Sequence, residues 1–285
     1  MLQNLSYNGL SFSEVRPFLG KLWCEIFGDS EEFVDAFFHY CASENVLHTL
    51  SLNGHVVSVL YTLPYELTYN GNTEQVAYIY AVATDKEYRG RGLMRHLMSQ
   101  VHESLRIKGY VAALLLPSSS ALALYYASMG YRECAYRKTI MLAVETDYEG
   151  YTYEKCSTLN EEVFVFIKSY MALRRDNIIH PKSSLAMNVV SCTLSGGGLF
   201  IAKQRGTICA AAFVSLEESR PLILEIITYD NEAQKSLVAY LGKLYAVSTI
   251  PLLCCDKKDG VPFAMALPFD SSFPETIRLQ LMLDK

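Results

Sequence analysis

The stretch that decides the fold is VAYIYAVAT (residues 76–84), DKEYRGRG (85–92) and LMRHLMSQVHESL (93–105). The first segment is a run of apolar residues, which predicts a buried strand. The last segment has apolar residues at positions 93, 94, 97, 98, 101 and 105, the spacing of an amphipathic helix. We therefore expect the chain to pass from a strand, through a turn rich in glycine, into a helix.

The turn Arg89-Gly90-Arg91-Gly92 has the composition of an anion site. A helix N-terminus leaves about four backbone N–H groups unpaired and carries roughly half a positive charge. Gly90 and Gly92 put no side chain between those amides and a phosphate, and Arg89 and Arg91 add charge-assisted hydrogen bonds. The turn is neither a Walker A loop nor a GxGxxG turn. A pyrophosphate site and a solvated basic turn both fit this segment alone.

The segments around this core predict an alternation of helices and strands that occurs twice. In the first half, turns at Asn53-Gly54 and Asn70-Gly71 predict two hairpins. Capping and periodicity predict helices over 14–27 and from 29 or 30 to 41, strands over 47–52, 55–61, 66–69, 74–84 and 110–116, and a helix over 120–129. In the second half we expect helices over 160–174, 183–193 and 232–246, and strands over 197–204, 207–216, 222–229, 250–254, 262–268 and 277–283.

The repeated order predicts an α/β (α+β) chain of two similar lobes, residues 1–145 and 146–285. Each lobe is expected to hold a mixed, mostly antiparallel sheet flanked by helices. The second lobe lacks the glycine turn, because its strand PLILEIITYD leads directly into NEAQKSLVAYL. Asp230 and Glu232 would place negative charge where a phosphate would lie. We therefore expect one cofactor site per chain.

The turn and its flanks resemble the pyrophosphate motif R/Q-x-x-G-x-G/A of the GNAT superfamily of N-acyltransferases. Arg89 and Gly92 fit the motif, and Met94 departs from it at the sixth position. Downstream, Tyr126 lies four residues before the Gly130-Tyr131 pair, which is the spacing of the tyrosine in that superfamily. The form RGRGLMRHLM is most similar to the two-lobed enhanced-intracellular-survival branch. Tyr125 would point about 100° away on the same helix and is expected to pack on the sheet.

The resemblance implies an acetyl-CoA-dependent N-acetyltransferase that moves an acetyl group to a primary amine. Acetyl-CoA would lie in a V-shaped gap between the strands 76–84 and 110–116. The implied cofactor-binding residues are Val82, Thr84, Arg89, Gly90, Arg91, Gly92, Leu93 and Met94, with backbone groups of Val82 and Thr84 holding the pantetheine arm and the thioester.

In the implied mechanism the amine attacks directly, a backbone N–H stabilises the oxyanion, and Tyr126 protonates the leaving thiolate as general acid. No base is visible: residues 77–83 contain no carboxylate, and Glu66 and Glu74 are expected to be solvated. A non-catalytic acyl-CoA-binding or regulatory protein on a GNAT scaffold is the alternative reading, and a pure scaffold protein is a third.

The amino-acid composition of the chain limits the classes of molecule that it is expected to bind. The formal net charge of −5 argues against nucleic-acid binding, and no apolar stretch approaches the ~20 residues that span a bilayer. The eight cysteines are scattered and the N-terminus lacks a signal-peptide pattern, so we expect free thiols and a cytoplasmic protein. The histidines lack the spacing of metal ligands, and we expect no metal. The acceptor is expected to be a small-molecule or peptide amine. The sequence leaves open whether the chain forms a homo-oligomer.

Overall fold

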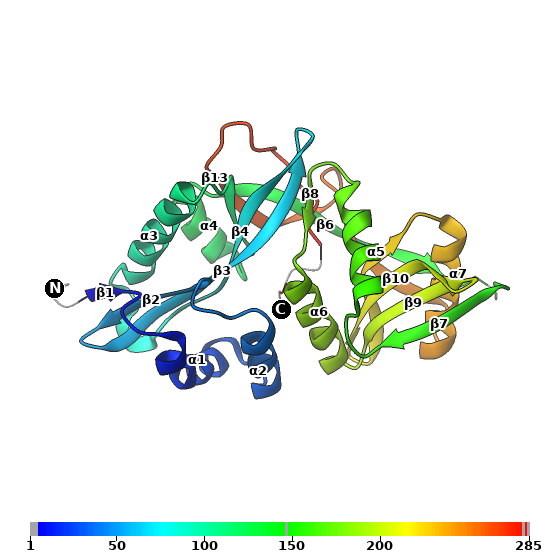
Figure 1. Cartoon of the computed structure of the whole chain (residues 1–285), viewed down its shortest axis with the longest axis horizontal. Helices are drawn as coiled ribbons and strands as arrows, with labels where there is room; N and C mark the ends of the chain where they lie inside the picture. The colour runs from blue at the N-terminus through cyan, green and yellow to red at the C-terminus, as the bar shows by residue number, and fades with distance from the viewer. Residues whose placement is uncertain (1–4, 146–147, 281–282, 284–285) are drawn as a thin grey trace. The chain divides into compact units, whose positions relative to one another are not determined.

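The computed structural model describes residues 5–145, 148–280 and 283. The chain forms two units, and Figure 1 labels their elements. The first unit comprises Met1–Glu66, Thr73–Arg132 and Ala264–Phe273. The second comprises Leu67–Asn72, Glu133–Phe263 and Pro274–Lys285. The units thus differ from the expected halves 1–145 and 146–285, because each takes a segment from the other half of the sequence.

The first unit is built on strands that follow the order β1-β2-β3-β4-β5-β13. The strands are β1 (Leu5–Tyr7), β2 (Leu47–Leu52), β3 (His55–Tyr69), β4 (Asn72–Thr84), β5 (Ala112–Leu115) and β13 (Val261–Pro268). β1–β2, β2–β3 and β5–β13 pair antiparallel, whereas β4 and β5 are parallel. The segments 55–61 and 66–69, expected as two strands, form the single strand β3.

Helices cover both faces of this sheet (Figure 1). They are α1 (Phe12–Phe27), α2 (Glu31–Tyr40), α3 (Leu93–Ile107) and α4 (Ser120–Ala127). Trp23 and Phe37 from α1 and α2 pack on Tyr61 and Tyr80 of one face. On the other face, α3 buries the stripe Leu93, Leu97, Met98, Val101 and Leu105 against Ala77, Ile79, Ala113 and Leu115. The amphipathic spacing read from the sequence is thus the core face of α3.

Local signals set the helix starts. Ser11 caps α1 in a capping box with Glu14, and Ser30 caps α2 by accepting a hydrogen bond from the Phe33 N–H. Of the two predicted starts of this helix, residues 29 and 30, Ser30 is the N-cap. Asp29 instead accepts a hydrogen bond of 2.8 Å from the Trp23 indole N–H.

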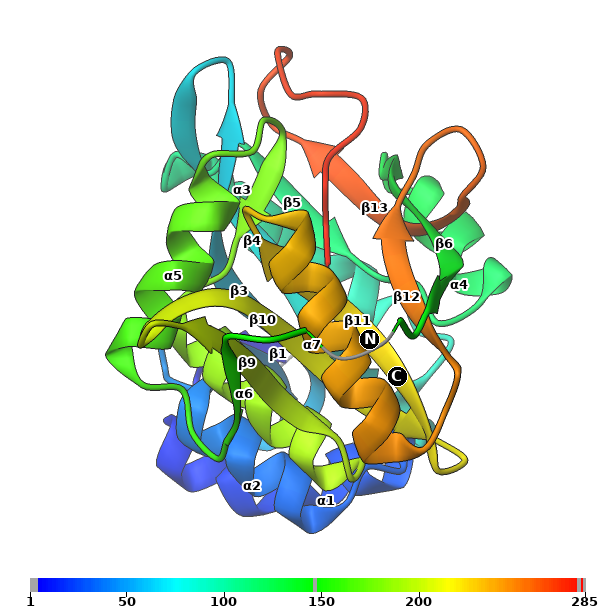
Figure 2. The ribbon, with the colours of Figure 1, turned by 90° about the vertical axis from the view of Figure 1, so that its right-hand side faces the viewer.

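The second unit is built on strands in the order β6-β12-β11-β10-β9-β7. Its strands are β6 (Arg132–Ala143), β7 (Tyr151–Cys156), β9 (Gly198–Gln204), β10 (Thr207–Glu217), β11 (Arg220–Thr228) and β12 (Thr249–Cys255), with the short β8 (Asn177–Ile179) beside the end of β3. The helices are α5 (Glu161–Ala172), α6 (Lys182–Leu194) and α7 (Asn231–Tyr245). α5 and α6 pack on one face, and α7 lies across β9, β10 and β11 on the other (Figure 2).

Each unit therefore has a mixed, mostly antiparallel sheet flanked by helices, which confirms the predicted fold class. The sequence analysis gave no strand for β1, β6, β7 or β8, and two predicted strands near the C-terminus differ from the structure. Residues 264–268, expected in the second lobe, belong to the first unit and pair with β5, whereas β6 pairs with β12. The strand expected over 277–283 is not present in the described part of that segment, where Arg278 makes only an isolated bridge to Asn177 and residues 281–282 lie outside the described residues.

Candidate functional site

The site begins where β4 and β5 separate. The two strands pair in parallel only over three positions, Val76 with Ala112, Ala77 with Ala113 and Tyr78 with Leu114. β5 ends at Leu115, whereas β4 continues to Thr84. The last six residues of β4, from 79 to 84, therefore have no strand partner on the β5 side. In an open α/β sheet, ligands bind outside the carboxyl ends of parallel strands where neighbouring strands diverge.

A bulge at Ala81 interrupts β4 three residues beyond its last pair with β5. Ala81 has φ +48°, in the left-handed region that a non-glycine residue adopts at a cost of about 1–2 kcal/mol. Ala77 and Ile79 face α3, and strict alternation would turn Val82 away from that helix. Val82 nevertheless packs in the same cluster as Ala77 and Ile79. The left-handed residue thus shifts the phase of the strand and places Val82 on the α3 face.

The glycine turn gives α3 an open N-terminus. A short 3-10 helix, Lys86–Tyr88, leads from β4 into the turn. Gly90 and Gly92 have φ +74° and +75°, and Gly92 is the N-cap of α3 with no side-chain hydrogen bond to the first turn. The helix's own bonding starts with His96 N–H to Gly92 O at 3.1 Å. The preceding N–H groups at this end are those that a bound anion would accept from.

The glycines are needed for conformation rather than for space. A Cβ built on Gly90 or Gly92 meets no atom within 4 Å. Their positive φ angles are the reason that glycine stands at both positions. The open space beside each Cα also leaves room for a ligand.

Both predicted arginines brace the turn. Arg89 Nε donates to the Thr84 carbonyl at 3.0 Å, and Arg91 Nη2 donates to the Glu87 carbonyl at 3.0 Å. Arg91 also lies over the Tyr88 ring, 5.2 Å from its centroid. Each guanidinium keeps further N–H donors, and both side chains belong to exposed residues. The Thr84 carbonyl, one of the backbone groups predicted to hold the pantetheine arm, thus accepts a hydrogen bond from Arg89 and keeps a second lone pair.

α4 brings Tyr126 into the cluster of α3. Tyr126 is 6% exposed and packs together with Leu93, Met94 and Val82. Its ring lies 5.8 Å from that of Tyr131, whose hydroxyl bonds His102 Nε2 at 2.8 Å. The helix ends in a turn at Gly130 with φ +94°, where Tyr131 N–H donates to Tyr126 O at 3.2 Å. The Gly-aromatic pair thus fixes the end of the helix that carries Tyr126.

Arg95, which the sequence reasoning did not select, ties the two helices of the site together. Its Nη2 donates to Ser128 Oγ at 2.6 Å and its guanidinium lies 5.4 Å from the Tyr125 ring centroid. A cation at the C-terminal end of α4 also complements the helix dipole. Arg95 and Ala81 gave no motif signal, because their roles depend on contacts and on a backbone angle.

Burial controls the protonation of the aromatic and imidazole groups near the site. Burial, with a smaller effect of Tyr125, raises the pKa of Tyr126 to about 12. Tyr126 is therefore a protonated hydrogen-bond donor at neutral pH. Burial likewise lowers the pKa of His102 to about 4, so this histidine is neutral and structural.

The corresponding region of the second unit is arranged differently. β11 and β12 pair in parallel only at Ile223 and Leu252. Beyond this point, Gln280 Nε2 donates to the Leu253 carbonyl at 3.0 Å and Cys255 Sγ donates to the Leu279 carbonyl at 3.1 Å. The Asp230 carboxylate caps α7 by accepting from the N–H groups of Glu232 and Ala233. The Asp230 carboxylate therefore uses N–H groups of α7 to which a cofactor phosphate would bind, and residues 279–280 lie against β12 beyond its pairing with β11.

Within residues 5–145, 148–280 and 283, no group of three or more His, Cys, Asp or Glu side chains is placed to hold a metal ion. In the same described ranges, no helix has the length and apolar character that a bilayer crossing requires.

Comparisons with known proteins agree with this geometry. The family model of the acetyltransferase (GNAT) domain matches residues 12–134, the segment that contains the separated strands, the glycine turn and Tyr126. A search of curated protein sequences finds no match.

Solved structures resemble the chain over most of its length. A GCN5-related N-acetyltransferase from Anabaena variabilis has TM-score 0.74 and 14% identity, with 92% of this chain and 72% of that chain covered. Eis1 from Mycobacterium abscessus has TM-score 0.67 and 10% identity over 93% and 73% of the two chains. A tandem GNAT protein from the clavulanic acid biosynthesis pathway has TM-score 0.54 and 11% identity over 99% and 100%. The TM-scores show that these proteins share the fold of this chain.

The match to the GNAT domain model and the whole-chain likeness to a tandem GNAT structure confirm the resemblance inferred from the motifs. Residues 12–134 of this chain match the acetyltransferase (GNAT) domain, and the chain has the fold of the two-lobed GNAT proteins across both units.

Proposed function

We propose that the first unit transfers an acetyl group from acetyl-CoA to a primary amine. The observation that carries the proposal is the uncapped N-terminus of α3 beside the free end of β4, with Arg89 and Arg91 on the same turn. The pyrophosphate would bind the N–H groups that begin at Gly92, Leu93 and Met94. The two arginines supply positive charge at this point, which suits a pyrophosphate better than a neutral ligand.

The pantetheine arm would then lie along β4 beyond Tyr78, where the strand has no partner on the β5 side. Backbone groups of Val82 are the ones proposed to hold the arm and the thioester oxygen. Thr84 is proposed to hold the arm as well, and its carbonyl also accepts a hydrogen bond from Arg89. An N–H donor aimed at the thioester oxygen would stabilise the tetrahedral oxyanion.

In the proposed chemistry the neutral amine nitrogen attacks the thioester carbonyl carbon, and a C–N bond forms as the carbonyl becomes an oxyanion. The nitrogen then loses a proton to solvent, the C–S bond breaks, and the sulfur leaves as a thiolate that gains a proton. Tyr126 is the proposed donor, because burial keeps its hydroxyl protonated at neutral pH. Its hydroxyl would donate a hydrogen bond to the sulfur as negative charge develops there.

The alternative, a non-catalytic acyl-CoA-binding protein, is favoured by one observation: residues 77–83 of β4 contain no carboxylate that could act as a base. The two functions separate in one experiment. A panel of amines is incubated with acetyl-CoA and the chain, and release of free CoA is followed with a thiol reagent. Amine-dependent thiol release supports the transferase. Tight acetyl-CoA binding without thiol release for any amine supports the binding protein.

A further inference from the structure

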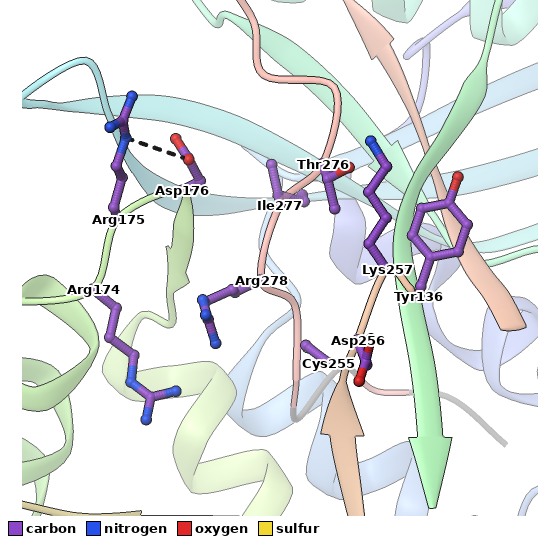
Figure 3. A pocket seen from close by; sticks show the side chains of 10 residues that line it. All are labelled: Tyr136, Arg174, Arg175, Asp176, Cys255, Asp256, Lys257, Thr276, Ile277 and Arg278. Atoms are coloured by element: carbon purple, nitrogen blue, oxygen red, sulfur yellow. Dashed lines mark ion pairs between the residues drawn. The ribbon is translucent and has the colours of Figure 1, made fainter. Parts of the chain in front are cut away.

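The second unit contains a pocket of ≈ 620 Å³ that the proposed transferase does not use. Four separate segments line it: residue 136 on β6, residues 174–176 between α5 and β8, residues 255–257 at the end of β12, and residues 276–278. Figure 3 shows their side chains around the space. The volume is within the ~300–1,000 Å³ range of pockets for small molecules.

The charges that line this pocket do not balance. Arg174, Arg175, Lys257 and Arg278 bring four cations, whereas Asp176 and Asp256 bring two carboxylates. Asp256 is ion-paired with Lys138 outside the pocket lining.

Two of the four cations have carboxylate partners. Arg175 pairs with Asp176 at 3.5 Å, and Lys257 pairs with Glu275 at 3.3 Å. Among the described residues, no carboxylate lies within ion-pair distance of Arg174 or Arg278.

These two arginines are held near each other. The Arg278 backbone is fixed by hydrogen bonds from its N–H to Asp176 O at 2.6 Å and from Ile178 N–H to its carbonyl at 3.0 Å. Arg174 stacks on Tyr170 with its guanidinium 4.2 Å from the ring centroid. Burial lowers the pKa of Arg174, and the charge of Arg278 lowers it further. Two like charges are thus kept close in a partly buried place.

The acid behind Arg174 is a poor counter-ion. Glu225 is 5% exposed, and its buried Oε2 accepts no hydrogen bond from the described residues. It follows a bulge in β11, where Phe213 pairs with Glu225 but Val214 pairs with Ile223. Burial raises its pKa to about 7, although Arg174 acts in the opposite direction. At neutral pH Glu225 therefore carries only part of a negative charge.

We propose that this pocket binds a phosphorylated small molecule and holds its phosphate between Arg174 and Arg278. A phosphate monoester brings close to two negative charges and three acceptor oxygens, which match two guanidinium groups better than one carboxylate would. The Thr276 hydroxyl in the lining is a further donor, since its buried Oγ1 has no partner among the described residues. The pocket is larger than a phosphate group, so the organic part of the ligand also fits.

Isothermal titration with ribose 5-phosphate tests the proposal, with ribose and citrate as comparison ligands. Saturating CoA keeps the glycine turn of the first unit occupied, and about 150 mM NaCl screens attraction to the general surface. We expect ribose 5-phosphate to bind and ribose not to bind. Arg174→Gln and Arg278→Gln are each expected to weaken binding at least about tenfold, the effect of losing one charged hydrogen-bond partner. Arg278→Lys keeps the positive charge but loses the paired N–H donors of the guanidinium. Its affinity for ribose 5-phosphate is expected to lie between those of the two glutamine variants and that of the unmodified chain.

Matched variants distinguish this pocket from other sites. Arg220→Gln removes an exposed arginine of the same unit outside the pocket and is expected to leave the ribose 5-phosphate affinity unchanged. Glu225→Gln removes the competing charge beside Arg174 and is expected to tighten binding about twofold or more. Three results would each overturn the proposal: no binding of ribose 5-phosphate, equal losses in the Arg278 and Arg220 variants, or tighter binding of citrate than of ribose 5-phosphate.

Discussion

Replacing Gly92 with alanine is expected to weaken acetyl-CoA binding through the open N-terminus of α3. Gly92 has φ +75°, and a Cβ there meets no atom within 4 Å. The cost in the ligand-free chain is therefore conformational only, about 1–2 kcal/mol for an L-residue in the left-handed region. The lost freedom of the unfolded chain offsets part of it, which leaves about 1 kcal/mol. In a domain of this size that lowers the Tm by about 2–4 °C.

Gly54 provides a matched control within the same unit. It has φ +80° in the turn between β2 and β3, and a Cβ there also meets nothing within 4 Å. Gly54→Ala is therefore expected to cost the same free energy of unfolding as Gly92→Ala. The two variants differ only in their distance from the proposed phosphate site.

The assay combines thermal unfolding with isothermal titration of acetyl-CoA. At Gly92 the new methyl group enters the space beside the first free N–H groups of α3. Loss of one charge-assisted hydrogen bond to a phosphate is worth about 1.5–3 kcal/mol, so the Kd is expected to rise tenfold or more. Gly54→Ala is expected to keep the unmodified Kd. Equal acetyl-CoA affinity of the two variants would refute the role of the glycine turn.

Three further perturbations test other parts of the account. Tyr126→Phe is expected to keep acetyl-CoA affinity but lower turnover by about 100-fold, whereas Tyr125→Phe keeps most activity; an unchanged rate in Tyr126→Phe would contradict its role as donor. Glu225 has its folded-state pKa raised from 4.5 to about 7, so the folded chain holds the proton more tightly than the unfolded chain. The free energy of unfolding is then expected to fall by about 3 kcal/mol between pH 4.5 and pH 8, and Glu225→Gln removes this slope in denaturant titrations; the same slope in both chains would contradict the buried acid. Ala81→Val places a β-branched residue at φ +48° and is expected to lower the Tm and acetyl-CoA affinity together, whereas Ala81→Gly keeps both; a Val variant with the original Tm would argue against the bulge.

Much of the fold could be predicted because its signals are local. The apolar stripe of α3, the turns at Asn53-Gly54 and Asn70-Gly71, and the glycines of the turn each depend on a few neighbouring residues. Strand pairing is not local in this sense. Nothing in residues 264–268 indicates that they pair with β5 and not with their sequence neighbours, since any apolar edge strand offers the same backbone groups.

Only some features of the proposed site leave a signal in the sequence. Glycine, arginine and the Tyr126 to Gly130 spacing leave a pattern in the sequence, and the structure places Val82, Leu93, Met94 and Tyr126 in one cluster. Arg95 and Ala81 leave none, because an arginine on a helix surface and an alanine in a strand are both ordinary. The bond from Arg89 to the Thr84 carbonyl was also unpredictable, since it depends on how the turn folds back on β4.

The stoichiometry of acetyl-CoA binding tests the central claim most directly. The first unit offers an uncapped helix N-terminus beside an unpaired strand end, and the second has Asp230 as the cap of α7 and residues 279–280 along β12. Isothermal titration of the full chain is expected to give one bound acetyl-CoA per chain. The double variant Arg89→Gln/Arg91→Gln is expected to bind this acetyl-CoA with lower affinity. Two acetyl-CoA molecules per chain, or one whose affinity does not change in the double variant, would contradict the account.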